Sequence, residues 1–437
     1  MMNDIQPGRQ SLFDFSKVPA DAVKIINDFD NIIQGVRPLN SRQLQQLPEN
    51  IRALSHQMTD ERASRRLGYM NENIQLSSYV RYFTWWNLVR LTRLFANLPA
   101  QSFPQEDSVC LDLGSGPLTI VTALFLARPE LRERKLVWYC LDVSANSMAL
   151  GEDIFLSVCA KLNARSWQII RVKGSFGTAI KQKAAFITCA NMFNELDQAS
   201  DMPPEFKVKK YFDQLQHYAH KQAAFLLIEP GVPKAARTLS LLRERFIKAG
   251  AAVVAPCAHS KECPMNGFKA YTGSKNKWCN FAFETKDAPA RLMKLSGAAK
   301  LPKERATLSF ISVASEQIEV PVLRQAQQPH GSQQPHGFQQ PHGFQQPHGF
   351  QQPHGSQQPQ NLQIRITSDK LRLPNYMCGF YGCSSLGLVL VTVPALNNTR
   401  LPKPPFMPQS GDLITVKKIT PDSQPKDQKS GAIMIKL

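Results

Sequence analysis

Short, continuously apolar segments alternate with helical segments between residues 105 and 255, and this alternation constrains the fold more than any other feature. The apolar segments are VCLDLGSG, KLVWYCLD, WQIIRVKG, AAFITCANMF and AAFLLIEPG. Strands that are apolar throughout are buried on both faces, which is typical of a parallel sheet covered by helices. We therefore predict a doubly wound, Rossmann-like α/β domain at 105–255.

A helical region is expected ahead of this domain, at 1–104. The segments VKIINDFDNIIQGV and SSYVRYFTWWNLVRLTRLFANL place apolar residues at helical spacing. Within the second segment, Tyr82, Trp85, Trp86 and Phe95 are predicted to be core residues rather than a surface for stacking bases.

A small β-rich domain is expected after residue 255. A basic, Cys-rich segment at 256–324 would include the first strand of that domain, ATLSFISVA. The remainder, at 361–437, contains LQIRIT, GLVLVTV, DLITVKKIT and AIMIKL.

The tandem repeat QQPHG(S/F) occupies 325–360, and its histidines recur every six residues at His330, His336, His342, His348 and His354. Pro, Gly and Gln every few residues preclude a packed core, so we expect a disordered insert in a loop of the β-rich domain. Neutral repeat expansion is favoured over weak metal binding.

Composition indicates the kind of partner. The formal net charge is +18, from 52 Lys and Arg against 34 Asp and Glu, which favours a polyanion, with nucleic acid ahead of an acidic membrane surface. No apolar run is long enough to span a membrane, and the first residues do not resemble a signal or transit peptide. We expect a cytoplasmic protein whose thiols stay reduced, which argues against disulfides.

The stretch CLDLGSGPLT places Asp112, Gly114, Ser115 and Gly116 at the carboxyl end of the first predicted strand. Its D-x-G-x-G pattern differs from the three-glycine turn that seats a dinucleotide pyrophosphate. S-adenosylmethionine has no phosphate, and an acidic residue before two glycines suits its ammonium group. Asp112, Gly114 and Gly116 are therefore predicted to cradle the methionine portion of that cofactor, and Ser115 is predicted to belong to the same binding site.

The second predicted strand ends in Asp142, where a carboxylate can accept hydrogen bonds from both ribose hydroxyls. An acid at this position is the ribose-binding residue in both cofactor classes, so Asp142 indicates a nucleoside ligand without choosing between them.

Five phrases carry a resemblance to a known family: LDLGSGPLT, NMFNELD, LLIEPGVPKAARTL, AAVVAPCAHSKECP and KWCNF. Over 105–232 the sequence resembles class I S-adenosylmethionine-dependent methyltransferases. More narrowly, it is similar to the ribosomal small-subunit methyltransferase-like family, which includes mitochondrial ribosome assembly factors and bacterial relatives. The resemblance implies binding of S-adenosylmethionine, association with small-subunit ribosomal RNA and a cysteine-ligated metal centre. We expect a monomer when the protein is free.

The residues that would catalyse methyl transfer are not evident. NMFNEL contains no Asn/Asp-Pro-Pro-Tyr motif for amino-group methylation, and no Pro-Cys motif supplies a nucleophile for pyrimidine chemistry. Asn191, Asn194 and Glu195 lie where a loop should face the substrate. These residues could hold the cofactor or the target base, and Asn191 is predicted to contact the cofactor. Capping of a following helix is the alternative for all three. Methyl transfer and a purely non-catalytic role both remain open.

Three cysteines, Cys257, Cys263 and Cys279, lie in a segment with few large apolar side chains. Their C-x5-C-x15-C spacing is not that of a zinc ribbon, and an iron–sulfur cluster suits irregular, widely spaced ligands at least as well. Surface thiols without a metal are the alternative. The resemblance implies Cys383 as the fourth ligand, with Cys378 second.

Other features bear on this metal centre. His259 would replace one thiolate in a zinc site. Metal binding would supply the folding free energy that the segment lacks. Between Cys257 and Ser309 there are ten Lys and Arg against four Asp and Glu, so we expect a surface for the phosphate backbone of RNA.

Overall fold

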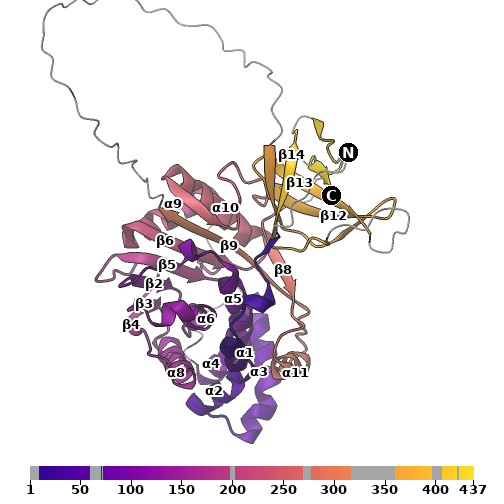
Figure 1. Cartoon of the computed structure of the whole chain (residues 1–437). Coiled ribbons are helices and arrows are strands. Elements are labelled where there is room, and N and C mark those ends of the chain that lie inside the picture. Colours follow the sequence, from indigo (N-terminus) through magenta and orange to yellow (C-terminus); the bar gives the residue numbers. More distant parts are fainter. Residues whose placement is uncertain are drawn as a thin grey trace, which may run out of the picture.

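The computed structural model describes residues 9–59, 70, 72–196, 202–268, 277–315, 360–395, 406–420 and 423–437. The five histidines of the repeat lie outside these residues. In the described part of the chain, helices near the N-terminus pack beside an α/β domain, and a second sheet lies at the other end of that domain (Figure 1). Of the helices described, none is both long and apolar enough to cross a membrane.

The N-terminal region is helical, as predicted. Its elements are η1 (Phe15–Lys17), α1 (Ala20–Asn27), α2 (Phe29–Val36), α3 (Ser41–Thr59), α4 (Asn73–Ser78), the π-helical segment η4 (Tyr79–Thr84), α5 (Trp85–Asn97) and η5 (Ala100–Ser102). Tyr82, Trp85, Trp86 and Phe95 are each at most 3% exposed, which confirms that they are core residues. The indole of Trp85 donates a hydrogen bond to the carbonyl oxygen of Ile26 at 2.8 Å.

The predicted α/β domain contains a mixed sheet in the order β4-β3-β2-β5-β6-β9-β7, with β8 paired to β9. The strands are β2 (Val109–Leu113), β3 (Val137–Asp142), β4 (Gln168–Lys173), β5 (Ala184–Ala190), β6 (Ala219–Glu229), β7 (Ala251–Ala255), β8 (Phe281–Glu284) and β9 (Arg305–Ser315). The strands β2 to β6 run parallel to one another, which confirms the expected doubly wound arrangement.

Helices cover both faces of this sheet. They are α6 (Thr119–Ala127), α7 (Pro129–Arg132), α8 (Ala145–Lys161), α9 (Pro204–Tyr218) and α10 (Pro233–Lys248). One core joins α6 and α8 to the N-terminal helices, and its ring contacts include Phe125 with Phe155. A separate core lies under α9 and α10, where Phe225 packs against Phe246.

One strand differs from its expected place. We predicted ATLSFISVA to open the β-rich C-terminal domain, but β9 lies antiparallel between β6 and β7 in the large sheet. Phe310, Ile311 and Val313 are at most 4% exposed, so the strand is buried on both faces. The α/β domain therefore extends to residue 315, because β9 satisfies the backbone groups along the edge of β6, a pairing that local sequence pattern does not reveal.

The C-terminal sheet has the order β1-β14-β10-β12-β13-β15, with β11 paired to β12. Its strands are β1 (Gln10–Ser11), β10 (Gln360–Ile366), β11 (Leu371–Leu373), β12 (Met377–Ser384), β13 (Gly387–Pro394), β14 (Asp412–Ile419) and β15 (Ile433–Lys436). The four later strands predicted from apolar runs are thus present. The N-terminal β1 was not expected, and α11 (Ala290–Ala298) connects β8 to β9 along the chain.

Candidate functional site

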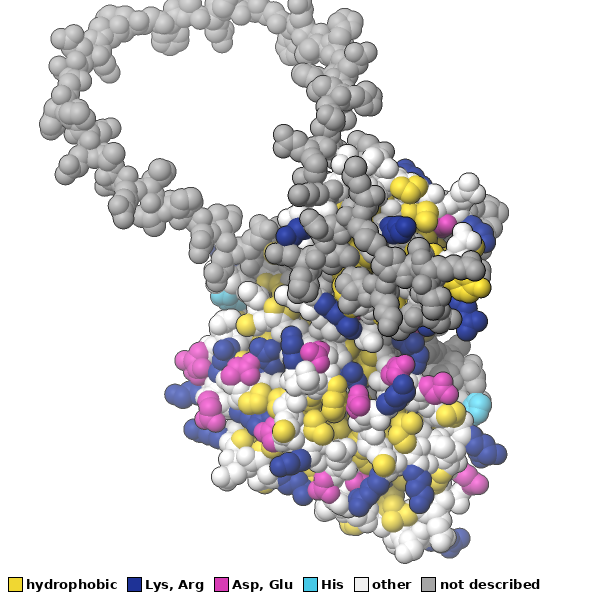
Figure 2. Space-filling model, turned by 45° about the vertical axis from the view of Figure 1, so that its right-hand side comes forward, with side chains coloured by type: hydrophobic (Ala, Val, Ile, Leu, Met, Phe, Trp, Pro, Cys, Tyr) yellow, Lys and Arg dark blue, Asp and Glu magenta, His cyan; other side chains and the backbone are white. Residues whose placement is uncertain are grey.

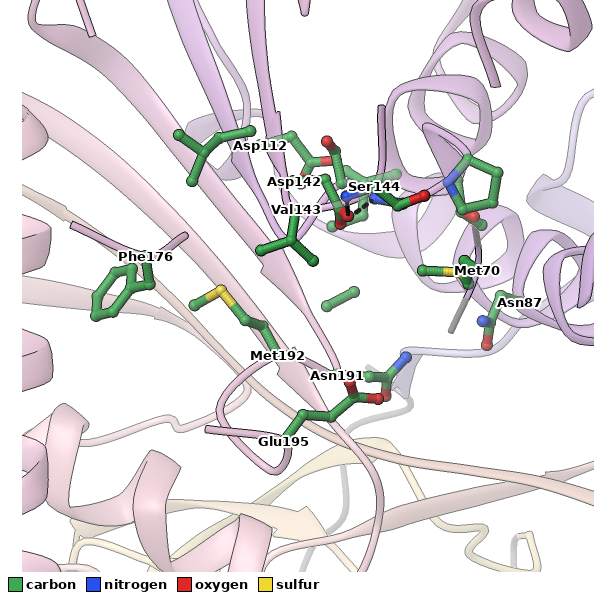
Figure 3. A pocket seen from close by; sticks show the side chains of 18 of the residues that line it. Met70, Asn87, Asp112, Asp142, Val143, Ser144, Phe176, Asn191, Met192 and Glu195 are labelled. Carbon is green, nitrogen blue, oxygen red and sulfur yellow. Dashed lines mark hydrogen bonds between the residues drawn. The ribbon is translucent and has the colours of Figure 1, made fainter. Parts of the chain in front are cut away.

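A pocket opens at the carboxyl ends of β2, β3 and β5, beside the glycine turn (Figure 3). Every residue that we expected to bind the cofactor lines this pocket: Asp112, Gly114, Ser115, Gly116, Asp142 and Asn191. The carboxyl edge of a doubly wound sheet is where such folds bind ligands. The structure therefore brings the six predicted residues to one cavity.

Two glycines shape the turn after β2. Gly114 has φ of 64° and Gly116 has φ of 48°, in the left-handed region that favours glycine. The backbone N–H groups of Gly114 and Ser115 both donate to the carbonyl oxygen of Leu141, at 2.9 and 3.1 Å. A Cβ atom at Gly114 would lie 3.1 Å from the Cβ of Met192, so the absence of a side chain lets the turn and the loop of Met192 approach this closely.

Asp142 ties the end of β3 to the glycine turn. Its Oδ2 accepts a hydrogen bond from the N–H of Gly116 at 2.9 Å, and its Oδ1 accepts one from the N–H of Ser144 at 2.8 Å. Burial raises the pKa of Asp142 above its ordinary value, and these hydrogen bonds act in the opposite direction. Because each carboxylate oxygen has a second lone pair, Asp142 can also accept hydrogen bonds from ligand hydroxyls.

Asp112 is almost completely buried, at 1% exposed. Its Oδ1 accepts a hydrogen bond from the hydroxyl of Thr188 at 2.7 Å, while its Oδ2 has no hydrogen-bond partner among the described residues. Burial raises the pKa of Asp112 to about 7, the Thr188 hydroxyl lowers it, and the negative charge of Asp142 raises it. A cationic group in the pocket would therefore stabilise the ionised form of Asp112.

The loop after β5 forms the opposite wall. In Figure 3, Asn191, Met192 and Glu195 lie across the pocket from Asp142. Asn191 adopts a φ of 59°, and its N–H donates to the carbonyl oxygen of Ile228 at 2.9 Å. The described part of this loop ends at Leu196, and the next described helix, α9, begins at Pro204, so the helix-capping alternative stays untested.

A buried glutamate at the end of β6 fixes this loop by accepting hydrogen bonds from its backbone. The carboxylate of Glu229 accepts hydrogen bonds from the N–H groups of Phe193, at 2.8 Å, and Asn194, at 3.2 Å. Burial raises the pKa of Glu229 to about 8, although these two hydrogen bonds lower it. The sequence analysis did not identify this residue, and its position inside IEPG at a strand end was the available signal.

The N-terminal helical region also contributes to the pocket, which the sequence did not indicate. Met70, Tyr79, Asn87 and Leu91 line the pocket, and Figure 3 shows Met70 and Asn87 at the end away from Phe176. The π-helical geometry of η4 begins at Tyr79. Such segments are frequent at functional sites, but their hydrogen-bond pattern cannot be recognised from sequence.

The predicted metal ligands come from three separate parts of the fold. Cys257 and Cys263 follow β7, Cys279 precedes β8, and Cys383 lies in β12. Burial raises the pKa of Cys279 well above its ordinary value, and negative charge on Cys257, Cys383 and Cys263 raises it further. Burial and the charges of Cys257 and Cys263 likewise raise the pKa of Cys383 well above its ordinary value. The four thiols therefore lie within electrostatic range of one another.

The two candidates for the fourth metal ligand lie on opposite faces of the C-terminal sheet. Cys378 and Cys383 are five residues apart on β12, so their side chains point to opposite faces of the sheet. Cys378 belongs to the hydrophobic core of the C-terminal sheet. Cys383 lies on the other face, beside the remaining thiols.

The geometry around the thiols is not that of a bound metal. Among the residues that the structure describes, no group of three or more His, Cys, Asp or Glu side chains is arranged to hold a metal ion. Several buried polar atoms near Cys263 nevertheless have no hydrogen-bond partner within the described residues: both ring nitrogens of His259 and Nε of Arg243. Burial lowers the pKa of His259 to about 4, and the charge of Arg243 lowers it too.

The remaining cysteines are core residues. Cys110, Cys140, Cys159 and Cys189 are buried, and burial raises the pKa of each. These thiols are therefore protonated at neutral pH and poorly reactive.

Positive charge near the Cys-rich segment is partly neutralised. Lys286, Arg291 and Arg305 form ion pairs with acidic residues, at 2.6 to 2.8 Å. On the face shown in Figure 2, Lys and Arg are interspersed with Asp and Glu rather than gathered in one patch. Lys269 and Lys275 lie outside the described residues.

The doubly wound sheet, the glycine turn after β2 and the acid at the end of β3 match the fold that the resemblance to class I methyltransferases led us to expect. A family model described as "Mitochondrial small ribosomal subunit Rsm22" matches residues 91–330. The match spans more than half of the 437 residues, and the chain belongs to this family. Among curated proteins, none matches the chain.

Solved structures similar to this chain include methyltransferases of low sequence identity. A precorrin-6y C5,15-methyltransferase from Geobacter metallireducens is 12% identical, with 51% of this chain and 86% of that chain covered and a TM-score of 0.30. A methyltransferase from Geobacter sulfurreducens in complex with S-adenosyl-L-homocysteine is 11% identical, with 53% and 90% covered and a TM-score of 0.30. A methyltransferase from Thiobacillus denitrificans, in complex with the same compound, is 11% identical, with 53% of this chain and 91% of that chain covered and a TM-score of 0.30.

Proposed function

We propose that this protein binds S-adenosylmethionine in the pocket and associates with the small ribosomal subunit through its RNA, in ribosome assembly or translation. It would act in the cytoplasm, as a monomer when free. The observation that carries the cofactor assignment is the unpartnered, buried Oδ2 of Asp112 beside a two-glycine turn. Membership of a family named for the small ribosomal subunit supports the partner.

The residues of the pocket fit the chemistry of the cofactor. Asp112 would accept a hydrogen bond from its ammonium group, which offsets the cost of burying the carboxylate. Asp142 would accept hydrogen bonds from the ribose hydroxyls while it continues to hold the turn. Asn191 would position the cofactor from the opposite wall. The bound cofactor supplies an activated methyl group, and the chain supplies its orientation and the exclusion of water.

Methyl transfer to ribosomal RNA is the first candidate reaction. The second candidate is a non-catalytic assembly factor, favoured by the loop NMFNEL, which lacks a recognisable methylation motif. Incubation of small subunits with the protein and cofactor labelled on its methyl group distinguishes them. Label incorporated into ribosomal RNA supports transfer, whereas cofactor binding without incorporation supports the assembly factor.

Asp142→Asn is expected to weaken S-adenosylmethionine binding by about 10- to 100-fold, because an amide nitrogen cannot accept a ribose hydrogen bond. Titration calorimetry measures the affinity. The matched control is Asp153→Asn, which changes an exposed carboxylate on α8 and should leave the affinity unchanged. Equal affinities for wild type and Asp142→Asn, with both proteins folded, would remove Asp142 from the cofactor site.

We also propose that Cys257, Cys263, Cys279 and Cys383 hold an iron–sulfur cluster, with zinc as the alternative. Four thiols form a soft donor set that suits either group. The unpartnered polar atoms of Arg243 and His259 fit an additional charged group beside these thiols. The bound centre would supply folding free energy to a segment with few large apolar side chains.

Two cysteines of the same strand test this metal site. Cys383→Ala is expected to abolish stoichiometric metal binding, whereas Cys378→Ala should retain it, because only Cys383 lies among the other thiols. Metal analysis and visible absorbance of anaerobically purified protein provide the measurements. Retention of the metal by Cys383→Ala would contradict the proposed ligand set.

A further inference from the structure

The loop that carries Cys257 and Cys263 is held by a buried arginine from the α/β domain. Arg243 lies on α10 and is 2% exposed. Its Nη1 donates to the carbonyl oxygen of Lys261 at 2.9 Å, and its Nη2 donates to that of His259 at 2.6 Å. Both carbonyls belong to the short stretch between the two cysteines.

A second buried arginine approaches the same loop from the C-terminal sheet. Arg365 on β10 is 7% exposed, and its Nε donates to the carbonyl oxygen of Pro256 at 2.8 Å. Its Nη1 donates to the carbonyl oxygen of Gly411 at 2.7 Å. In the pairing of β10 with β12, Arg365 lies directly opposite Cys383. Arg365 is thus adjacent to thiols from two separate segments.

Neither arginine forms an ion pair with a carboxylate within the described part of the chain. The nearby carboxylate of Asp412 forms its ion pair with Arg9, at 2.8 Å. Burying a cation without a negative partner is costly, and such groups are normally paired. Within the described residues, both guanidinium groups instead donate to backbone carbonyl oxygens beside the thiols. A metal centre bound by four thiolates would supply the missing negative charge.

We propose that Arg243 and Arg365 are positioning residues of the four-thiol centre. Arg243 holds the Cys257–Cys263 loop by two of its carbonyl oxygens, and Arg365 holds the carbonyl oxygen of Pro256, the residue just before the loop. The charges of the two arginines offset the negative charge of a metal bound by four thiolates. Because Arg243 comes from α10 and Arg365 from β10, the centre also joins the C-terminal sheet to the α/β domain. This inference rests on the proposed metal site.

The test is the affinity of the full-length, metal-free protein for Co²⁺, followed by the absorbance of cobalt–thiolate bonds. Arg243→Gln and Arg365→Gln are each expected to weaken Co²⁺ binding by about 10- to 100-fold, the usual effect of losing a residue that supports metal ligands. Arg365→Lys keeps the charge but loses the forked donor, so its affinity should lie between those of wild type and Arg365→Gln. If Arg365→Gln does not fold, Arg365→Lys provides the test at this position.

Arg305→Gln is the matched control. Arg305 is an exposed arginine of β9 that pairs with Asp369 at 2.6 Å, so it also bridges the α/β domain and the C-terminal sheet. Its replacement should change Co²⁺ affinity less than twofold. An equal loss in Arg305→Gln, or no loss in Arg243→Gln and Arg365→Gln, overturns the positioning role. Absence of Co²⁺ binding by the wild type, together with absence of iron and zinc from the anaerobically purified protein, overturns the metal site itself.

Discussion

Asp112→Asn is expected to raise the free energy of unfolding at pH 8 by about 4 kcal/mol, and to weaken S-adenosylmethionine binding at least tenfold. Asparagine has nearly the same shape and can still accept the hydrogen bond from Thr188. It carries no charge, so the cost of burying an ionised carboxylate disappears. The same change removes the anionic partner proposed for the cofactor's ammonium group, so stability and binding should move in opposite directions.

The effect on stability depends on pH in a defined direction. The pKa of Asp112 is about 7 in the folded protein, against an ordinary value of 3.8. Between these values the folded state binds more protons than the unfolded state, so this carboxyl lowers wild-type stability as pH rises. The advantage of Asp112→Asn should be absent near pH 4, grow up to pH 7 and remain constant above it.

Chemical denaturation at pH 5 and pH 8 measures this difference, and calorimetry at pH 8 measures the affinity. Asp153→Asn, at an exposed site, should change neither quantity. A variant that is less stable than wild type at pH 8, or one that binds the cofactor with full affinity, would contradict the role assigned to Asp112.

Gly151→Ala is expected to destabilise the protein by about 3 kcal/mol and to weaken cofactor binding at least tenfold. Gly151 lies on α8, where a Cβ atom would be 2.7 Å from both the Cα and the carbonyl oxygen of Pro117. These are backbone atoms of the turn that lines the pocket, and they cannot move aside as a flexible side chain would. The added methyl group would therefore displace the glycine turn itself.

Gly35→Ala provides the matched control for this substitution. Gly35 lies in α2, and no described atom is within 4 Å of the position that its Cβ would take. Alanine should raise stability there by up to about 1 kcal/mol, because it favours the helix. Thermal unfolding of both variants tests the account. If Gly151→Ala unfolds at the wild-type temperature, the close approach of α8 to the turn has no energetic consequence.

Features set by neighbouring residues were predictable from the sequence. The turn at Gly114 and Gly116 follows from two glycines after a buried strand, and the position of Asp142 follows from the end of the next apolar run. Parallel strands place their carboxyl ends at one edge of the sheet. The convergence of these residues on a single pocket was therefore accessible without coordinates.

Features set by long-range pairing were not predictable in this way. The apolar pattern of β9 identified a strand but not its neighbours β6 and β7. Met70 and Asn87 reach the pocket only because the N-terminal helices pack against α6 and α8. Arg243 and Arg365 occur in ordinary helical and strand patterns, and their shared loop became evident only from the packing of α10 against the Cys-rich segment.

The most direct test of the central claim is a crystal structure of the protein with S-adenosyl-L-homocysteine at saturating concentration. Our account predicts the compound in the pocket between the glycine turn and the loop after β5. Its ribose hydroxyls should bond to the carboxylate of Asp142, and its ammonium group should lie next to Oδ2 of Asp112. A well-ordered pocket without the compound, or the compound bound elsewhere on the fold, would contradict the account.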